Sequence, residues 1–181
     1  MKRARDVNAP KALALIGLAA CLLVPAVATA ISEYKVKAAF LLNFGKFVEW
    51  PSSAQGGALE ICVLGRDPFG STLDDTLAGR TVGSRSVKAR RVSSSADADD
   101  CSILFVSRAD QARVSDVVAR FADSPVLLVG EQDRFARQGG MINFVEVNQK
   151  VRFEINEAAA KRAGLKISSQ LLKLATIVDG G

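Results

Sequence analysis

Short apolar runs alternate with amphipathic helical patterns through the middle of this chain, and this alternation restricts the fold more than any other feature does. Most of the apolar runs have no polar face, which is typical of parallel strands covered by helices on both sides. The middle of the chain therefore predicts an α/β fold. The predicted elements, in chain order, are strand 60–64, helix 70–78, strands 85–92 and 101–106, helix 109–122, strand 125–129 and helix 133–138.

The last third of the chain changes pattern. Runs at 141–147 and 150–155 flank Asn148-Gln149 and predict an antiparallel hairpin. Asn156 is a suitable N-cap for a helix over 157–163, and a closing helix begins at Ser168 or Ser169 and extends toward Val178. No repeat or linker separates these parts. We expect a single α/β domain with a mixed, mostly parallel sheet flanked by helices and a C-terminal antiparallel hairpin.

Residues 32–50 predict a helix that Ser32 caps and Pro51 ends. Lys35, Lys46 and Glu49 form a narrow polar stripe, and most other positions are apolar. A helix of this kind is buried on more than one side. Either the domain wraps around it or a partner covers part of it, and an exposed part would be a natural homodimer surface.

The N-terminus predicts export. Four basic residues precede an apolar stretch over 12–24, and Ala28-Thr29-Ala30 follows. This is the pattern of a secretory signal peptide cleaved after Ala30. We therefore expect a signal peptide over 1–30, a domain over 31–181 and a periplasmic location. A lipoprotein lipidated at Cys21 is the alternative, and it is disfavoured because the apolar run continues beyond that cysteine.

The nearly balanced net charge and the absence of histidine exclude several classes of function. Four of the 24 basic residues and one of the 19 acidic residues lie in the signal peptide, so the net charge falls from +5 to +2 after cleavage. A nearly balanced surface is a poor footprint for nucleic acid. The chain has no histidine, so Ser-His-Asp and Cys-His catalysis and histidine-based zinc sites are excluded.

Two cysteines, Cys62 and Cys101, remain after cleavage. An even number in an exported chain favours one disulfide, because the periplasm is oxidising. Two buried reduced thiols are the alternative. A disulfide closing a loop of this length would contribute about 4 kcal/mol in the chain-entropy model. A metal site on two cysteines without histidine is not expected.

Three short motifs invite a catalytic or binding interpretation and do not support it. The turn at 65–70 lacks the phosphate-loop patterns, and the acidic residues at 74–75 and 97–100 lack the spacing of a calcium loop. The serines at 93–95 have no histidine to act as a base. No catalytic, cofactor-binding or metal-binding residue is predicted.

Four charged residues, Arg152, Glu154, Arg162 and Lys166, follow one another along the predicted second hairpin strand and the next helix. They form either an ordinary solvated face or the polar rim of a protein-binding patch, for which arginine is well suited. We take them as the candidate partner-binding residues.

Several segments resemble the YfiR-like family of periplasmic regulators. The resemblance covers nearly all of the predicted mature chain and is far more specific than any short motif above. The matching segments are EYKVKAAFLLNF at 33–44, FVEWP at 47–51, ICVLG at 61–65, CSILFV at 101–106, GGMINF at 139–144, KVRFEIN at 150–156 and AGLKISSQLL at 163–172.

The resemblance implies a non-catalytic periplasmic repressor. Members of the YfiR-like family hold an inner-membrane diguanylate cyclase inactive by binding the cyclase's periplasmic sensor region. This repression lowers cyclic di-GMP, exopolysaccharide production and biofilm formation. An OmpA-type outer-membrane lipoprotein can sequester the regulator. The resemblance also matches Cys62 and Cys101 to a family disulfide and places partner contacts near Glu154 and Arg162. The best-known member of the family has a second disulfide, which would fall in the segment 136–143, where this chain has no cysteine.

A periplasmic small-ligand-binding module remains the alternative function, because an α/β sheet can hold a cleft at the carboxyl ends of its strands. A hydrolase is disfavoured, since no nucleophile–base pair is visible. The repressor requires no cofactor.

Overall fold

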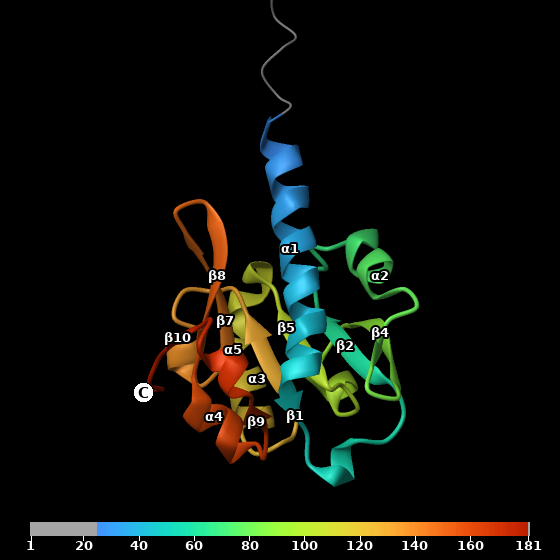
Figure 1. Ribbon diagram of the computed structural model, residues 1–181. Helices are drawn as coiled ribbons and strands as arrows, with labels where there is room; N and C mark the ends of the chain where they lie inside the picture. The colour runs from blue at the N-terminus through green and yellow to red at the C-terminus, as the bar shows by residue number, and fades with distance from the viewer. Residues whose placement is uncertain (1–24, 181) are drawn as a thin grey trace, which may run out of the picture.

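The computed structural model describes residues 25–180 and shows a mixed eight-stranded sheet flanked by helices (Figure 1), which confirms the predicted fold class. The strand order is β10-β8-β7-β6-β5-β2-β4-β3, and β1 and β9 form a separate antiparallel pair. The strands are β1 (Val48–Glu49), β2 (Leu59–Leu64), β3 (Thr81–Val82), β4 (Arg85–Val92), β5 (Ile103–Val106), β6 (Leu127–Gly130), β7 (Ile142–Val147), β8 (Lys150–Ile155), β9 (Lys166–Ile167) and β10 (Thr176–Ile177).

The central strands β4, β2, β5, β6 and β7 are all parallel, and β8 returns antiparallel to β7. From β2 the chain moves outward to β4, and from β5 it moves in the opposite direction to β6. Because such crossovers are right-handed, the two connecting helices lie on opposite faces of the sheet. The strand order therefore reverses between β2 and β5. In open α/β sheets, ligands bind at this kind of reversal, beyond the carboxyl ends of the strands.

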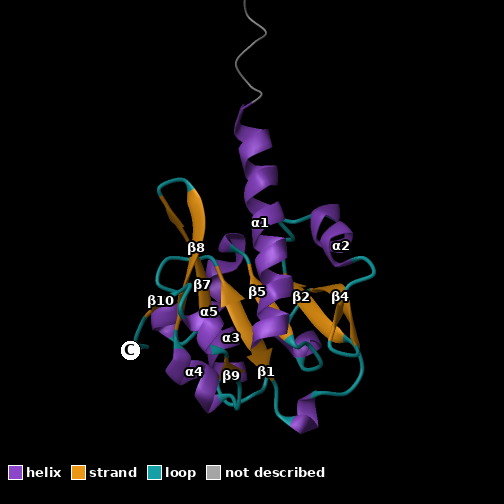
Figure 2. Ribbon diagram, in the orientation of Figure 1, coloured by secondary structure: helices purple, strands orange, loops and turns teal. Residues whose placement is uncertain are grey.

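Helices flank the sheet, and α1 runs along the front of it and extends beyond its upper end (Figure 2). On this face Phe40 and Phe44 pack against Phe144 and Phe153 of the hairpin, with ring centroids 5.3–6.1 Å apart. The α-helices are α1 (Pro25–Phe47), α2 (Ser71–Leu77), α3 (Val114–Phe121), α4 (Glu157–Arg162) and α5 (Ser169–Leu172).

The first helix differs from its prediction at both ends. It begins at Pro25, so Ser32 lies within it and is not its cap. It ends at Phe47, because Val48 and Glu49 leave the helix to pair with β9. The backbone N–H of Ser168 also donates to the carbonyl of Phe47, at 2.9 Å. A segment more than a hundred residues away in sequence therefore ends the helix, three residues before Pro51 would.

The predicted closing helix is wrong beyond its first turn. Ser168 caps α5 through its side chain, but the helix is only four residues long. The chain then forms β10 parallel to β8, and Val178 N–H donates to the carbonyl of Ile155 at 2.9 Å. Leu174, which the apolar spacing would place on the buried face of such a helix, is 68% exposed. Pairing with the sheet edge replaces the helix that the apolar spacing predicts.

Two other predicted helices are partly 3-10 turns. Residues 108–113 form a 3-10 turn before α3, and the predicted helix 133–138 is reduced to Ala136–Gln138. The hairpin is confirmed, with Val147 opposite Lys150. Asn148 and Gln149 both have positive φ, as a tight two-residue turn requires.

The signal peptide remains a sequence prediction. Residues 1–24, including Cys21, lie outside the described residues, and α1 runs through the proposed cleavage point after Ala30. Within residues 25–180, no helix has the length and apolar character that crossing a bilayer requires.

Candidate functional site

A buried group of charged and polar side chains lies where the N-terminal half of α1 meets the carboxyl ends of β5 and β6. Its centre is Glu131, which follows β6 directly and is only 2% exposed. Lys37 from α1, 3% exposed, pairs with it. We call Glu131, Lys37, Tyr34 and Glu33 the Glu131 cluster. Buried charges are rare in proteins unless they are paired, so this cluster is the most unusual polar feature of the core.

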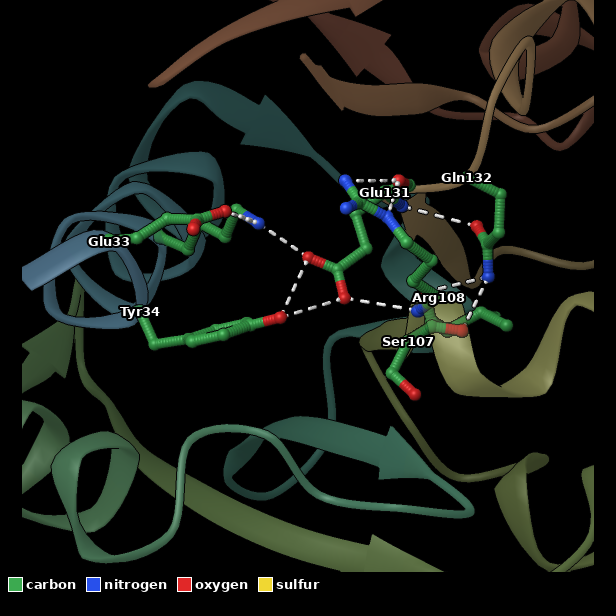
Figure 3. Close-up of polar contacts among 8 residues, drawn as sticks. Glu33, Tyr34, Ser107, Arg108, Glu131 and Gln132 are labelled. Atoms are coloured by element: carbon green, nitrogen blue, oxygen red, sulfur yellow. Dashed lines mark hydrogen bonds and ion pairs between the residues drawn. The ribbon is translucent and has the colours of Figure 1, made fainter. Parts of the chain in front are cut away.

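Every contact of the Glu131 carboxylate comes from a donor (Figure 3). Lys37 donates to one oxygen, and the Tyr34 hydroxyl lies 3.1 and 3.3 Å from the two oxygens. The backbone N–H of Arg108 donates to Oε1 at 3.0 Å. Lys37 also donates to Glu33 at 2.5 Å, so its ammonium bridges two carboxylates.

The electrostatics of the cluster keep Tyr34 as a donor. Burial, and then the charge of Glu131, raise the pKa of the Tyr34 hydroxyl above its ordinary value. The Lys37 ammonium lies 4.7 Å from the centre of the Tyr34 ring, in cation–π range. The tyrosine is therefore protonated at physiological pH and satisfies the carboxylate. The cluster anchors α1 to the carboxyl ends of β5 and β6.

Gln132 ties the ends of β5 and β6 together behind this cluster. Its side-chain oxygen accepts from the backbone N–H of Glu131 at 3.1 Å. Its amide nitrogen donates to the carbonyls of Val106 and Ser107, at 3.2 and 2.7 Å. The loop carrying Glu131 is thus held in position by a fully used side-chain amide.

A groove of about 620 Å³ lies beside the Glu131 cluster. It falls within the volume range of small-molecule sites. On its floor Asn143 is 1% exposed and donates weakly to Glu154 at 3.4 Å, and its side-chain oxygen has no partner among the described residues. Charged residues of both signs line the groove: Arg108, Arg134, Arg137, Glu131, Asp133, Glu146 and Glu154.

The structure divides the four predicted partner residues between two places. Glu154 and Arg152 lie on β8, and Glu154 reaches the groove. Arg162 ends α4, and Lys166 lies on β9 opposite Glu49. Figure 1 shows α4 and β9 at the lower end of the molecule, while the hairpin projects at the upper end. The four residues therefore do not form one continuous rim, and their role in binding stays a prediction.

Cys62 and Cys101 are joined by a disulfide, as the even cysteine count and the resemblance implied, with Cα atoms 5.9 Å apart. The bond links the middle of β2 to the loop before β5. Arg90 donates to the Cys101 sulfur at 3.3 Å, and its guanidinium lies 2.8 Å from Glu60. A smaller pocket of about 330 Å³ lies beside the disulfide, at the opposite end of the strands from the groove.

The crevice between β2 and β5, where the strand order reverses, is filled by the chain itself. Asp110 accepts hydrogen bonds from the Ser107 hydroxyl at 3.1 Å and from the backbone N–H of Arg66 at 3.2 Å. A Cβ at Gly65 would lie 2.4 Å from an Asp110 oxygen. Asp110 therefore fills this reversal, and the open groove lies between the carboxyl end of β6 and β7.

We expect Gly65→Ala to lower the free energy of unfolding by about 1–3 kcal/mol, because Gly65 has φ +71° and the new methyl group would displace Asp110. Gly56→Ala is the control, since nothing lies within 4 Å of a Cβ there. Urea unfolding of both variants measures the effect. Equal stabilities would show that the loop adapts without cost.

Sequence reasoning missed Lys37 and Glu131. Lys37 lies between Val36, which is 41% exposed, and the buried Ala38, and nothing local distinguishes it from the exposed Lys35. The available signal was Glu131 itself, an acidic residue that follows a fully apolar strand directly. Within the described range, no three histidine, cysteine or carboxylate side chains gather as metal ligands would.

Comparison with known proteins adds two findings. A family model described as YfiR/HmsC-like matches residues 34–176. Among solved structures, the chain is similar to an ABC domain in complex with L-Trp from Streptococcus pneumonia, with 15% identity and a TM-score of 0.46. That match covers 66% of this chain and 55% of the other, so this chain spans about half the length of that protein. A likeness at this level supports no inference about what this chain binds.

Proposed function

Because the chain belongs to the YfiR/HmsC-like family of periplasmic regulators of diguanylate cyclases, we propose that it binds and represses the periplasmic sensor region of an inner-membrane diguanylate cyclase. The repression would lower cyclic di-GMP and, with it, exopolysaccharide and biofilm. The match over residues 34–176 is the single observation that carries this proposal. An OmpA-type outer-membrane lipoprotein would compete for the regulator and relieve the repression.

The proposed mechanism is binding without turnover. A regulator shifts a two-state receptor only by its different affinity for the two states. The regulator must therefore present a rigid surface that fits the inactive cyclase better than the active one. The disulfide and the Glu131 cluster support this role, because they fix α1 and β2 relative to the strands beside the groove. Removal of residues 1–30 as a signal peptide would place this surface in the periplasm.

Charge reversal at the groove tests the proposal. We expect deletion of the gene to raise cyclic di-GMP, and Glu154→Lys to restore less repression than the wild-type gene does, with an unchanged melting temperature. The reason is that Glu154 lies at the groove and is half-buried there. Asp123→Lys is the control, an exposed charge reversal just after α3. Full repression by Glu154→Lys would remove this residue from the partner surface.

The volume and buried polar floor of the groove favour one second function, a small-ligand-binding module. In that case deletion of the gene would leave cyclic di-GMP unchanged, and a metabolite would copurify with the protein. Mass spectrometry of denatured protein from periplasmic extract detects such a ligand. The two functions are thus separated by the deletion strain before any variant is made.

A further inference from the structure

Strand β7 continues past the end of the strand beside it. Strands β6 and β7 pair at only two positions, Val129 with Ile142 and Gly130 with Asn143. The chain then turns away from the sheet at Glu131, while β7 continues to Val147 with β8 as its only neighbour. The hairpin therefore projects beyond the sheet (Figure 1). Beyond Asn143, no strand within residues 25–180 pairs with this edge of β7.

The hairpin pairing fixes which backbone groups point outward from this edge. Asn156 N–H donates to the carbonyl of Met141 at 2.9 Å. In an antiparallel pair, hydrogen-bonded and non-hydrogen-bonded positions alternate along each strand. Asn143 and Val145 therefore bond across to β8, as the carbonyl of Met141 does, whereas the Met141 N–H donates to the carbonyl of Leu128 in β6 at 3.2 Å. The parallel pairing of Asn143 with Gly130 turns the Phe144 N–H toward β6, so the groups left along the free edge are the C=O of Phe144 and the N–H and C=O of Glu146.

The groove lies along this free edge. The three consecutive residues 144–146 of β7 form one side of it, and the turn that follows β6 forms the other. On that second side Asp133, Arg134 and Arg137 are exposed, and neither arginine makes an ion pair within the described part of the chain. An extended backbone entering the groove would take the place that β6 leaves empty.

We propose that the groove receives an extended segment of the partner protein, which adds to the free edge of β7 as a strand. Unpaired strand edges pair readily with another chain, and peptide recognition by strand addition uses this property. This inference rests on the proposed function and specifies its binding surface. It identifies residues 144–146 and the facing arginines as the contact, in addition to Glu154.

The charges select a partner segment over a second copy of this chain. In a two-fold pair of identical β7 edges, the Glu146 residues of the two copies would come close together, and like charges opposite each other are destabilising. A basic residue opposite Glu146 and acidic residues toward Arg134 and Arg137 would complement the groove instead. The expected segment is therefore extended and carries charges of both signs.

A matched pair of proline variants tests the strand addition. Glu146 and Val151 lie opposite each other in the hairpin, and their N–H groups point to opposite edges. Proline at either position removes one outward N–H without removing a bond between the two strands. The probes are purified periplasmic regions of the host's membrane diguanylate cyclases. We expect Glu146→Pro to bind the cognate region at least tenfold more weakly, because it loses roughly one hydrogen bond and also the carboxylate that faces the basic residue of the partner. Val151→Pro should bind as the wild type does.

Hydrogen exchange and a charge variant complete the test. On binding, the Glu146 amide should exchange about tenfold more slowly in the wild-type protein, and the Val151 amide should not change. If Glu146→Pro fails to fold, Glu146→Lys should weaken binding by a similar factor. Equal binding by wild type and Glu146 variants, or self-association through this edge, would overturn the inference and leave the proposed function standing. Failure of the wild-type protein to bind any cyclase region would overturn the proposed function itself.

Discussion

Replacing Lys37 by methionine is expected to lower the free energy of unfolding by about 3–5 kcal/mol, because it leaves a buried carboxylate without its counter-charge. Lys37 and Glu131 are 3% and 2% exposed, so water cannot take over the role of the lost ammonium. For a domain of this size the melting temperature should fall by about 10 °C. Thermal and urea unfolding followed by circular dichroism measure the change.

Lys35→Met is the matched control, because Lys35 lies on the same helix two residues earlier and is exposed. It should leave stability almost unchanged. Adding Glu131→Gln to Lys37→Met should recover part of the loss. A neutral amide needs no counter-charge, and its oxygen still accepts from Tyr34 and Arg108. If Lys37→Met and Lys35→Met have the same melting temperature, the ion pair contributes nothing to the stability of the fold.

Removing the disulfide is expected to have the second largest effect. The bond joins residues 39 positions apart, and a loop of this length corresponds to about 4 kcal/mol in the chain-entropy model. The variant Cys62→Ala/Cys101→Ala should therefore melt about 10 °C below the oxidised wild type. Alanine adds no polar group to a site where both sulfurs are buried.

The reduced wild-type protein should match the double alanine variant, and reductant should not change the melting of that variant. This second comparison separates the bond from side effects of the substitutions. Free thiols in the protein isolated from periplasmic extract would contradict the disulfide, and thiol titration detects them.

The elements predicted correctly are those whose signal is local. Arg85–Val92 forms a strand with the expected bounds, and the hairpin register follows from the alternating residues and the Asn148-Gln149 turn. Asn156 caps α4 as expected, accepting from the backbone N–H of Ala159 at 2.9 Å. In each case a few neighbouring residues contain all the information needed.

The elements that were missed depend on distant parts of the chain. Strands β1, β9 and β10 have two residues each, too few for a periodic pattern, and they exist because tertiary packing brings their partners alongside. The Glu131 cluster has the same origin, since Lys37 and Glu131 are 94 residues apart. The free edge of β7 is also invisible in sequence, because it results from the early end of β6.

The pairing of β1 with β9 determines when this chain can finish folding. The C-terminal end of α1 is held at Phe47 by Ser168, more than a hundred residues later in the sequence. Contacts this distant in sequence form slowly and only after both partners are present. Until β9 has docked, the end of α1 therefore lacks the strand that pairs with Val48 and Glu49. The end of α1 is therefore expected to become ordered late in folding, after the hairpin has already covered the aromatic residues of the helix.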